Sequence, residues 1–156
     1  MSQSITNQDT SSSITGLLVP LTDRTLLLPN VAVAELIPYR APQPAQGSPS
    51  WFLGQVSWRD LTLPLLSFEA ASGGQSEAGA KARVVVLNAL GGRDHVKFIA
   101  MLVQGIPRSI KVDPSLARSE ATLAPLELDA VNLGDAQARI PDLIALEQKL
   151  ADAGLI

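Results

Sequence analysis

The sequence predicts a mainly β fold that ends in one α-helix. Between residues 16 and 140, apolar residues recur in short runs with a period of two, and turn residues separate the runs. Such runs are typical of half-buried strands. The period changes only after Pro141, where leucines recur at helical spacing. The chain has 156 residues, 46% of them hydrophobic, so it can bury the core of one domain.

Two apolar runs open the predicted domain. Residues 16–21 and 25–29 flank the polar residues 22–24, which predicts a first hairpin. Residues 31–37 (VAVAELI) also alternate and predict a strand, although their alanines would permit a helical turn. Residues 38–49 hold several prolines and no apolar period, and therefore predict a surface loop.

Residues 51–69, WFLGQVSWRDLTLPLLSFE, predict the central hairpin of the fold. Its first strand covers residues 51–58, where every second residue falls on one apolar face that can be buried. Arg59 and Asp60 form the tip, and residues 61–66 return along the first strand. The members of the apolar face are Phe52, Gly54, Val56 and Trp58.

Three residues of this hairpin predict local features of the backbone. Asp60 tolerates the left-handed conformation that a tight hairpin turn requires, although glycine does so at lower steric cost. Pro64 has no N–H to donate, so its strand is expected at an edge or at a bulge. Gly54 inside an apolar strand predicts a bend or a close approach of another backbone.

The second half of the chain predicts a further long hairpin. Residues 83–90 and 96–103 are rich in β-branched residues and flank the turn at residues 91–94. A short strand is expected at residues 108–112, after which Asp113-Pro114 turns the chain away.

A weaker hairpin and a helix complete the predicted elements. Residues 130–133 and 138–140 flank the turn residues Gly134-Asp135. From Pro141 to the stop signal at Gly154, an amphipathic helix is expected, with its leucine stripe on the sheet. This stripe comprises Leu143, Leu146, Leu150 and Ala153.

The composition along the chain suggests one domain after a short tail. Residues 1–13 are polar, without a basic start or an apolar stretch, so we expect a disordered tail and neither a signal peptide nor an amphipathic anchor. Residues 14–156 are expected to form a single domain with two lobes. The small, glycine-rich residues of the segment 72–80 place the expected lobe boundary near residues 72–81.

Charge and cysteine content exclude several classes of partner and site. The formal net charge is -3 and the basic residues are scattered, so no patch for nucleic acid or anionic lipid is expected. The apolar runs are too short to span a membrane, which excludes direct insertion. The chain has no cysteine, which excludes disulfides and thiolate ligands and is compatible with the cytoplasm.

No catalytic residue, metal site or cofactor is expected from the sequence. The only histidine, His95, follows a turn and is expected to be solvated. The acids Glu35, Asp60 and Glu69 lie on different elements without ligand spacing and are interpreted as scattered surface acids. The glycine pairs are not followed by a helix start with lysine, so no phosphate loop is predicted.

The aromatic residues and one arginine are the candidates for binding. Trp51, Phe52 and Trp58 could stack a ligand, and aromatics beside an arginine can mark a protein-binding surface. Core packing is the default interpretation for at least one tryptophan. On location alone, Arg59 is better interpreted as a solvated charge at the hairpin tip than as a binding residue.

Three stretches of the chain resemble the CheW family of chemosensory coupling proteins: residues 28–39, 51–69 and 84–112. The most specific match is Gly54, then Trp58-Arg59, then Leu63-Pro64-Leu65, together with an upstream Val-x-Glu at Val33 and Glu35. Two departures stand out. Asp60 replaces the usual glycine of the turn, and residues 140–142 replace the usual apolar final strand and aspartate motif.

The resemblance implies two small SH3-like β-barrels, packed together, with a C-terminal helix. It also implies a non-enzymatic cytoplasmic adaptor that bridges chemoreceptor cytoplasmic tips to the regulatory domain of a CheA-type histidine kinase, recruited to membrane-bound receptor arrays. The binding region implied by the matched positions comprises Val33, Glu35, Gly54, Trp58 and Arg59.

A finer resemblance and two alternatives accompany this interpretation. The Tyr39 context, the Trp-Phe-Leu-Gly opening and the Trp58-Arg59 tip are similar to ChpC-type members of type IV pilus chemosensory systems, which implies a role in chemotaxis or twitching motility. The first alternative is a stand-alone small-ligand-binding β-barrel that uses Trp51 and Trp58 as a stacking platform. The second is a carboxylate enzyme built from Glu35 and Glu69.

Overall fold

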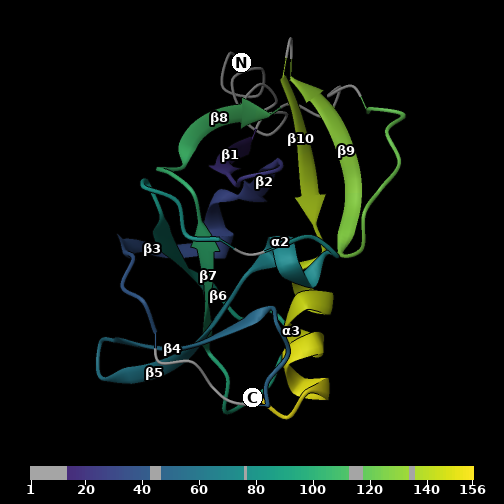
Figure 1. Cartoon of the computed structure of the whole chain (residues 1–156). Coiled ribbons are helices and arrows are strands. Elements are labelled where there is room, and N and C mark those ends of the chain that lie inside the picture. The colour runs from purple at the N-terminus through teal and green to yellow at the C-terminus, as the bar shows by residue number, and fades with distance from the viewer. Residues whose placement is uncertain (1–13, 43–46, 76, 113–117, 134–135) are drawn as a thin grey trace, which may run out of the picture.

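Ten strands form two five-stranded sheets in the part of the chain that the computed structural model describes, which comprises residues 14–42, 47–75, 77–112, 118–133 and 136–156. In Figure 1 one sheet lies in the upper part of the view and the other lies below it. The strands are β1 (Ile14–Pro20), β2 (Thr25–Pro29), β3 (Val33–Pro38), β4 (Phe52–Trp58), β5 (Leu61–Leu66), β6 (Arg83–Asn88), β7 (Phe98–Val103), β8 (Arg108–Val112), β9 (Glu127–Leu133) and β10 (Ala136–Pro141).

The first sheet joins strands from both halves of the chain. Its strand order is β8-β1-β2-β10-β9. The predicted first hairpin is confirmed, with β1 and β2 antiparallel and Leu18 opposite Leu27. β10 runs parallel to β2 and antiparallel to β9, so the predicted last hairpin also forms. The predicted turns at residues 113–114 and 134–135 lie outside the described residues.

The second sheet holds the central part of the chain. Its strand order is β3-β6-β7-β5-β4, and both predicted hairpins, β4-β5 and β6-β7, are antiparallel. β5 and β7 pair in parallel through Leu65 and Leu66 only. Pro64 therefore lies where β5 has left β7, which is consistent with its lack of an N–H.

The segment near residues 72–81 connects two strands of one sheet. β5 precedes it and β6 follows it, and both belong to the second sheet. The chain passes from one sheet to the other between β2 and β3 and again between β7 and β8. A single two-lobed domain over residues 14–156, with its boundary near 72–81, remains our proposal. The expected tail at residues 1–13 lies outside the described residues.

The apolar side chains form three clusters, and each sheet is buried on both faces. Alternate residues of β6 enter different clusters: Val85 joins a large one shared with the first sheet, whereas Val84 joins a smaller one within the second sheet. The first sheet has its own small cluster, which includes Leu18 and Leu27. Strands buried on both faces read as continuous apolar runs, as in the RVVVLN sequence of β6.

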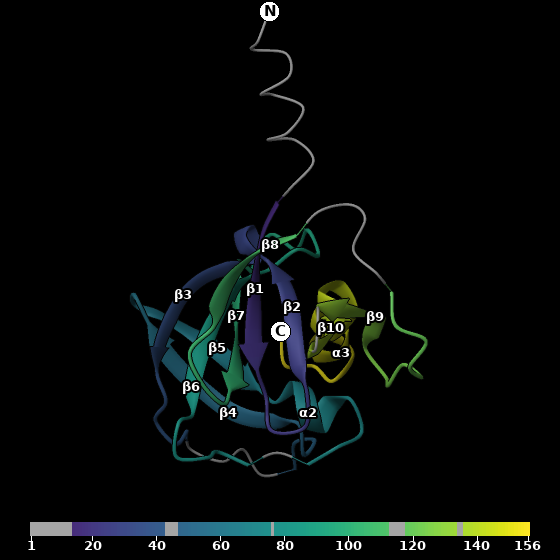
Figure 2. The same ribbon diagram turned by 90° about the horizontal axis from the view of Figure 1, so that it is seen from above.

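A C-terminal helix, α3 (Leu143–Asp152), covers one side of this core. Figure 2 shows α3 on the same side of the molecule as β9 and β10, opposite β3. Leu146 and Leu150 are fully buried in the shared cluster and Leu143 packs against it, which confirms the leucines of the predicted stripe. Its last member, Ala153, is instead exposed at the C-cap of the helix. The expected start at Pro141 is wrong, because Pro141 ends β10 and the Asp142 carboxylate caps the helix at 2.9 Å from the Ala145 N–H.

Two short helical segments lie between the strands, and only the first falls where the sequence left a helical turn open. A 3₁₀ turn, η1 (Asn30–Ala32), occupies the start of the predicted strand 31–37, where alanines permit a turn. A four-residue helix, α2 (Phe68–Ala71), follows β5 because the Ser67 side chain accepts the N–H of Ala70. None of the helices in the described part of the chain has the length and hydropathy that crossing a membrane requires.

The prediction that β4 has a single apolar face is wrong, because a bulge interrupts the start of the strand. The register shifts between Phe52 and Gly54, so two residues of β4 oppose one of β5. Because the extra residue reverses the side-chain alternation, Phe52 lies in the large shared cluster, whereas Trp58 lies in the small cluster of the second sheet. Gly54, at φ 137°, adopts backbone that other residues rarely reach.

Candidate functional site

A two-residue turn between β4 and β5 presents Arg59. Arg59 and Asp60 have φ values of 48° and 63°, so both are left-handed. Two left-handed residues are the requirement of the tight hairpin turn whose twist matches the flanking strands. The sequence correctly predicted this tip and the left-handed Asp60. The turn projects the Arg59 side chain from a rigid hairpin, where its side chain is 70% exposed.

Arg59 contacts two other predicted site residues. Its Nη2 lies 2.8 Å from Oε1 of Glu35, on β3, and its guanidinium lies 4.8 Å from the centre of the Trp58 ring. The Glu35 side chain is 38% exposed. Exposed ion pairs contribute only about 0–1 kcal/mol, and exposed cation–π contacts about 0.5–1 kcal/mol. These contacts orient the guanidinium more than they stabilise the fold.

Trp58 forms the base of this arrangement. It is 8% exposed and packs edge to face on Phe98, with ring centroids 4.8 Å apart. Its Nε1–H is buried, and no acceptor for it lies among the described residues. A buried donor without an acceptor is uncommon and costly in proteins. The tryptophan is therefore a core residue that retains an unused hydrogen-bonding group.

A surface groove of about 480 Å³ lies beside Trp58 and Arg59. One wall is the end of β3 with the residues that follow it, and the other is β4. We call it the β3–β4 groove. Its lining residues are Ile37, Pro38, Arg40, Ala41, Pro42, Gln55, Val56, Ser57, Trp58 and Arg59.

The structure brings together three of the five predicted site residues. Trp58 and Arg59 line the β3–β4 groove, and Glu35 pairs with Arg59. Val33 lies opposite Leu87 at the start of β3 and packs against the large shared cluster. Gly54 is opposite Leu65, where the bulge of β4 ends. These last two residues shape the strands and do not line the groove.

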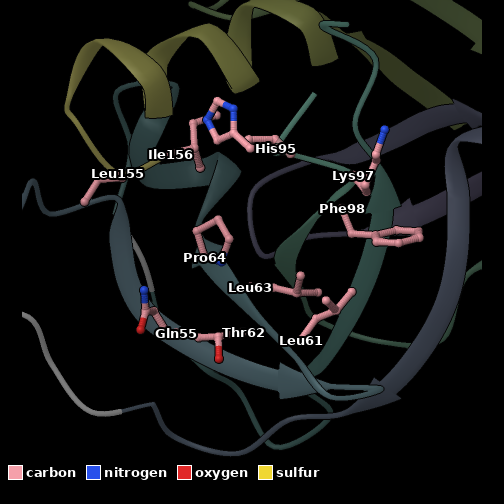
Figure 3. A pocket seen from close by; sticks show the side chains of 11 residues that line it. Gln55, Leu61, Thr62, Leu63, Pro64, His95, Lys97, Phe98, Leu155 and Ile156 are labelled. Carbon is pink, nitrogen blue, oxygen red and sulfur yellow. The ribbon is translucent and has the colours of Figure 1, made fainter. Parts of the chain in front are cut away.

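A second hollow, of about 230 Å³, was not predicted from the sequence. It lies where the start of β5 has left β7, next to the last two residues of the chain. Figure 3 shows its wall around Pro64, with His95 and Ile156 on one side and Gln55 and Thr62 on the other. Pro64 could have predicted this hollow from the sequence, because a proline in a strand interrupts its pairing with the neighbouring strand. His95 is exposed, as predicted.

The expectation that Glu69 is a surface acid is wrong. Glu69 is 2% exposed, and its Oε1 accepts the backbone N–H groups of Thr22, at 2.7 Å, and Asp23, at 3.0 Å. It is buried because it satisfies the turn between β1 and β2. Burial raises the pKa of Glu69, while the hydrogen bond from Arg24 lowers the pKa of Asp23.

Glu69 is expected to make the stability of the fold depend on pH. Because its pKa is raised above the ordinary 4.5, its contribution to folding is fully present below that value and is lost as the pH rises through the folded pKa. Glu69→Gln keeps the acceptor and adds an amide that can donate to Asp23. At pH 7 we therefore expect the free energy of unfolding of the variant, measured with urea, to be higher by about 1 kcal/mol. Its stability should also depend less on pH above 4.5.

The comparison variant for this measurement is Asp23→Asn, which removes the acid whose pKa is lowered. The stability contributed by Asp23 is present above its ordinary pKa of 3.8 and is lost as the pH falls. Asp23→Asn should therefore lose the stability that Asp23 contributes above pH 3.8. Because the Asp23 charge also raises the pKa of Glu69, this variant should depend less on pH in the higher window as well. Equal pH profiles for Glu69→Gln and the unmodified protein would contradict the prediction.

The described residues contain no group of three histidine or acidic residues that could hold a metal ion. Glu69 is buried at the turn between β1 and β2, whereas Glu35 pairs with Arg59 at the edge of the second sheet. The two acids proposed for a carboxylate enzyme therefore lie at separate places in the fold and do not form one site. What the site offers is an exposed guanidinium on an aromatic base beside a groove, which suits binding.

Comparison with known proteins identifies a family and a fold. The sequence profile of the CheW-like domain matches residues 15–150. Among solved structures, the scaffolding protein TtCheW from Thermoanaerobacter tengcongensis is similar, with a TM-score of 0.70 and 16% sequence identity over 83% of this chain and 84% of that chain. No curated protein matches the sequence. The predicted fold class, mainly β and CheW-like with a C-terminal helix, is thereby confirmed.

Proposed function

The chain belongs to the CheW-like domain family, and on this premise we propose that it couples chemoreceptors to a CheA-type histidine kinase. CheW-like scaffolding proteins are non-enzymatic adaptors, so its activity consists of binding. The proposed partners are the regulatory domain of the kinase and the cytoplasmic tips of the receptors. The proposed location is the cytoplasm, at membrane-bound receptor arrays.

One observation carries the assignment of the binding surface. Glu35 lies on β3, whereas Trp58 ends β4 and Arg59 follows it in the turn. β3 and β4 are not paired with each other, yet Arg59 contacts both Glu35 and Trp58. Arginines and tryptophans are enriched where binding energy concentrates in protein interfaces. We propose that Arg59, held over Trp58 and next to Glu35, is the centre of this surface, and that Val33 and Gly54 support it.

A finer proposal concerns the signalling pathway. The Tyr39 context, the Trp-Phe-Leu-Gly opening and the Trp58-Arg59 tip support a ChpC-type member of a type IV pilus system, and so a role in twitching motility. Tyr39 packs against the small cluster that contains Trp58. Tyr39 and Trp58 thus belong to one neighbourhood of the second sheet, whereas Trp51 and Phe52 lie in the large shared cluster.

The alternative of a small-ligand-binding barrel receives less support. Its stacking platform requires Trp51 and Trp58 together, but each is only 8% exposed and they lie in different clusters. Trp51 does not line the β3–β4 groove. A platform for a sugar or another ring needs an exposed aromatic face.

The test is a pull-down with the purified full-length protein against the chemosensory kinases and receptors of its own cell. Capture of a kinase and a receptor together supports the proposed coupling. Capture of pilus-system members in preference to flagellar ones supports the finer proposal. Capture of neither partner would overturn the proposed function and favour the ligand-binding alternative.

A further inference from the structure

The two walls of the β3–β4 groove are the two edges of one sheet. In the order β3-β6-β7-β5-β4, β3 pairs only with β6, and β4 pairs only with β5. Both edges line the groove, which opens onto the small cluster through Ile37, Val56 and Trp58. An edge strand presents unpaired backbone N–H and C=O groups, which can template another strand.

The two edges differ in how well they can accept a strand. β3 ends in Pro38, which has no N–H, and Pro42 follows on the same wall. Prolines on an edge are a common protection against pairing. β4 has an N–H at every residue from Gly54 to Trp58. In an antiparallel pair, the N–H and C=O groups of every second residue point away from the partner strand. Some of the N–H groups between Gly54 and Trp58 therefore point away from β5.

The charges around the groove favour an acidic partner. Its lining contains Arg40 and Arg59 but no acidic residue. Arg40 forms no ion pair with any residue that the structure describes. An arginine without an ion pair among the described residues, Arg40, beside the exposed Arg59 is what a carboxylate-bearing chain would satisfy.

We propose that the β3–β4 groove binds an extended acidic peptide segment of the partner, which adds as a strand along β4. Main-chain hydrogen bonds to β4 supply affinity, while side-chain pockets supply specificity. Apolar side chains of the segment pack on Ile37 and Val56, and a carboxylate pairs with Arg40 or Arg59. This inference rests on the proposed binding role of the Arg59 surface and names the kind of segment it takes.

Glu35 has a defined part in this proposal. It occupies the Arg59 guanidinium in the free protein, at 2.8 Å, and an incoming carboxylate must displace it or share the guanidinium with it. Glu35→Gln removes this competitor and should tighten acidic peptide binding by roughly threefold, the scale of one exposed ion pair. A purely structural role for the pair would instead make the variant bind less well.

The experiment uses the full-length protein and a short capped peptide that alternates valine with glutamate. One control peptide carries lysine in place of glutamate, and another is N-methylated at alternate backbone amides, which prevents strand pairing. Binding is followed by amide NMR and hydrogen exchange. We expect only the unmodified acidic peptide to bind, with new exchange protection between Gly54 and Trp58 and roughly fivefold weaker binding by Arg40→Ala.

Equal binding of the N-methylated peptide, or binding without protection of β4, would overturn strand addition. Failure of the acidic peptide to bind would overturn it as well. The pull-down separates this failure from that of the proposed function. A protein that captures kinase and receptor but not the peptide retains the adaptor role and loses the inference, whereas a protein that captures nothing loses both.

Discussion

Arg59→Ala is expected to weaken capture of the kinase or the receptor by about tenfold or more, with thermal unfolding nearly unchanged. The substitution removes an exposed ion pair and an exposed cation–π contact, each of which stabilises the fold by no more than about 1 kcal/mol. It does not change the strain of the turn, because alanine and arginine both carry a Cβ at φ 48°. Quantitative pull-down and thermal melting measure the two effects separately.

Charge reversal distinguishes a contact with the partner from a structural role. Arg59→Glu places a second acid beside Glu35 and should weaken capture further. The double variant Glu35→Arg with Arg59→Glu restores an internal ion pair with the opposite orientation. If Arg59 binds the partner, capture stays lost in the double variant. If Arg59 only holds β3 and β4 in place, capture returns.

Asp60→Gly is the matched control at the same turn. It removes a neighbouring charge and relieves the left-handed backbone of Asp60, at φ 63°, so the fold should gain about 1 kcal/mol. Its capture of partners should match that of the unmodified protein. Unaltered capture by both Arg59 variants would remove Arg59 from the site, and lost capture with a large fall in melting temperature would show that Arg59 holds the hairpin.

Glu147→Ala is expected to destabilise the fold by about 3 kcal/mol, the largest effect on stability that we predict. Glu147 lies on α3 and is 1% exposed. Its Oε1 accepts the N–H groups of Leu90, at 2.9 Å, and Gly91, at 3.0 Å, and its Oε2 pairs with Arg93. The single carboxylate thus joins the helix to the connection between β6 and β7. Urea unfolding measures the loss.

Gly91 provides a second, coupled test of the same contact. A Cβ at Gly91 would overlap Oε2 of Glu147 and crowd the Arg93 guanidinium that pairs with it. Gly91→Ala should therefore destabilise the unmodified protein but have little further effect in the Glu147→Ala variant. Ile144→Ala, at an exposed position of the same helix, is the control and should change stability by less than about 0.5 kcal/mol. Additive effects of the two substitutions at positions 91 and 147 would contradict the proposed contact.

The sequence was sufficient for those features that depend on neighbours along the chain. Period-two alternation located the hairpins β1-β2, β4-β5 and β6-β7, and the change of period located α3. The two polar residues Arg59 and Asp60 identified the tip of the central hairpin. The matched positions of the CheW-like domain then added Glu35, which periodicity alone would have left as an ordinary strand residue.

Tertiary structure decided the features that depend on residues far apart in the chain. One inserted residue in β4 sent Phe52 and Trp58 to different clusters, because side-chain alternation does not reveal a bulge. Glu69 became a buried acid because a turn 46 residues away donates two N–H groups to it. The meeting of Glu35 with Arg59 and the groove between two unpaired edges likewise follow from strand order, which a local pattern does not encode.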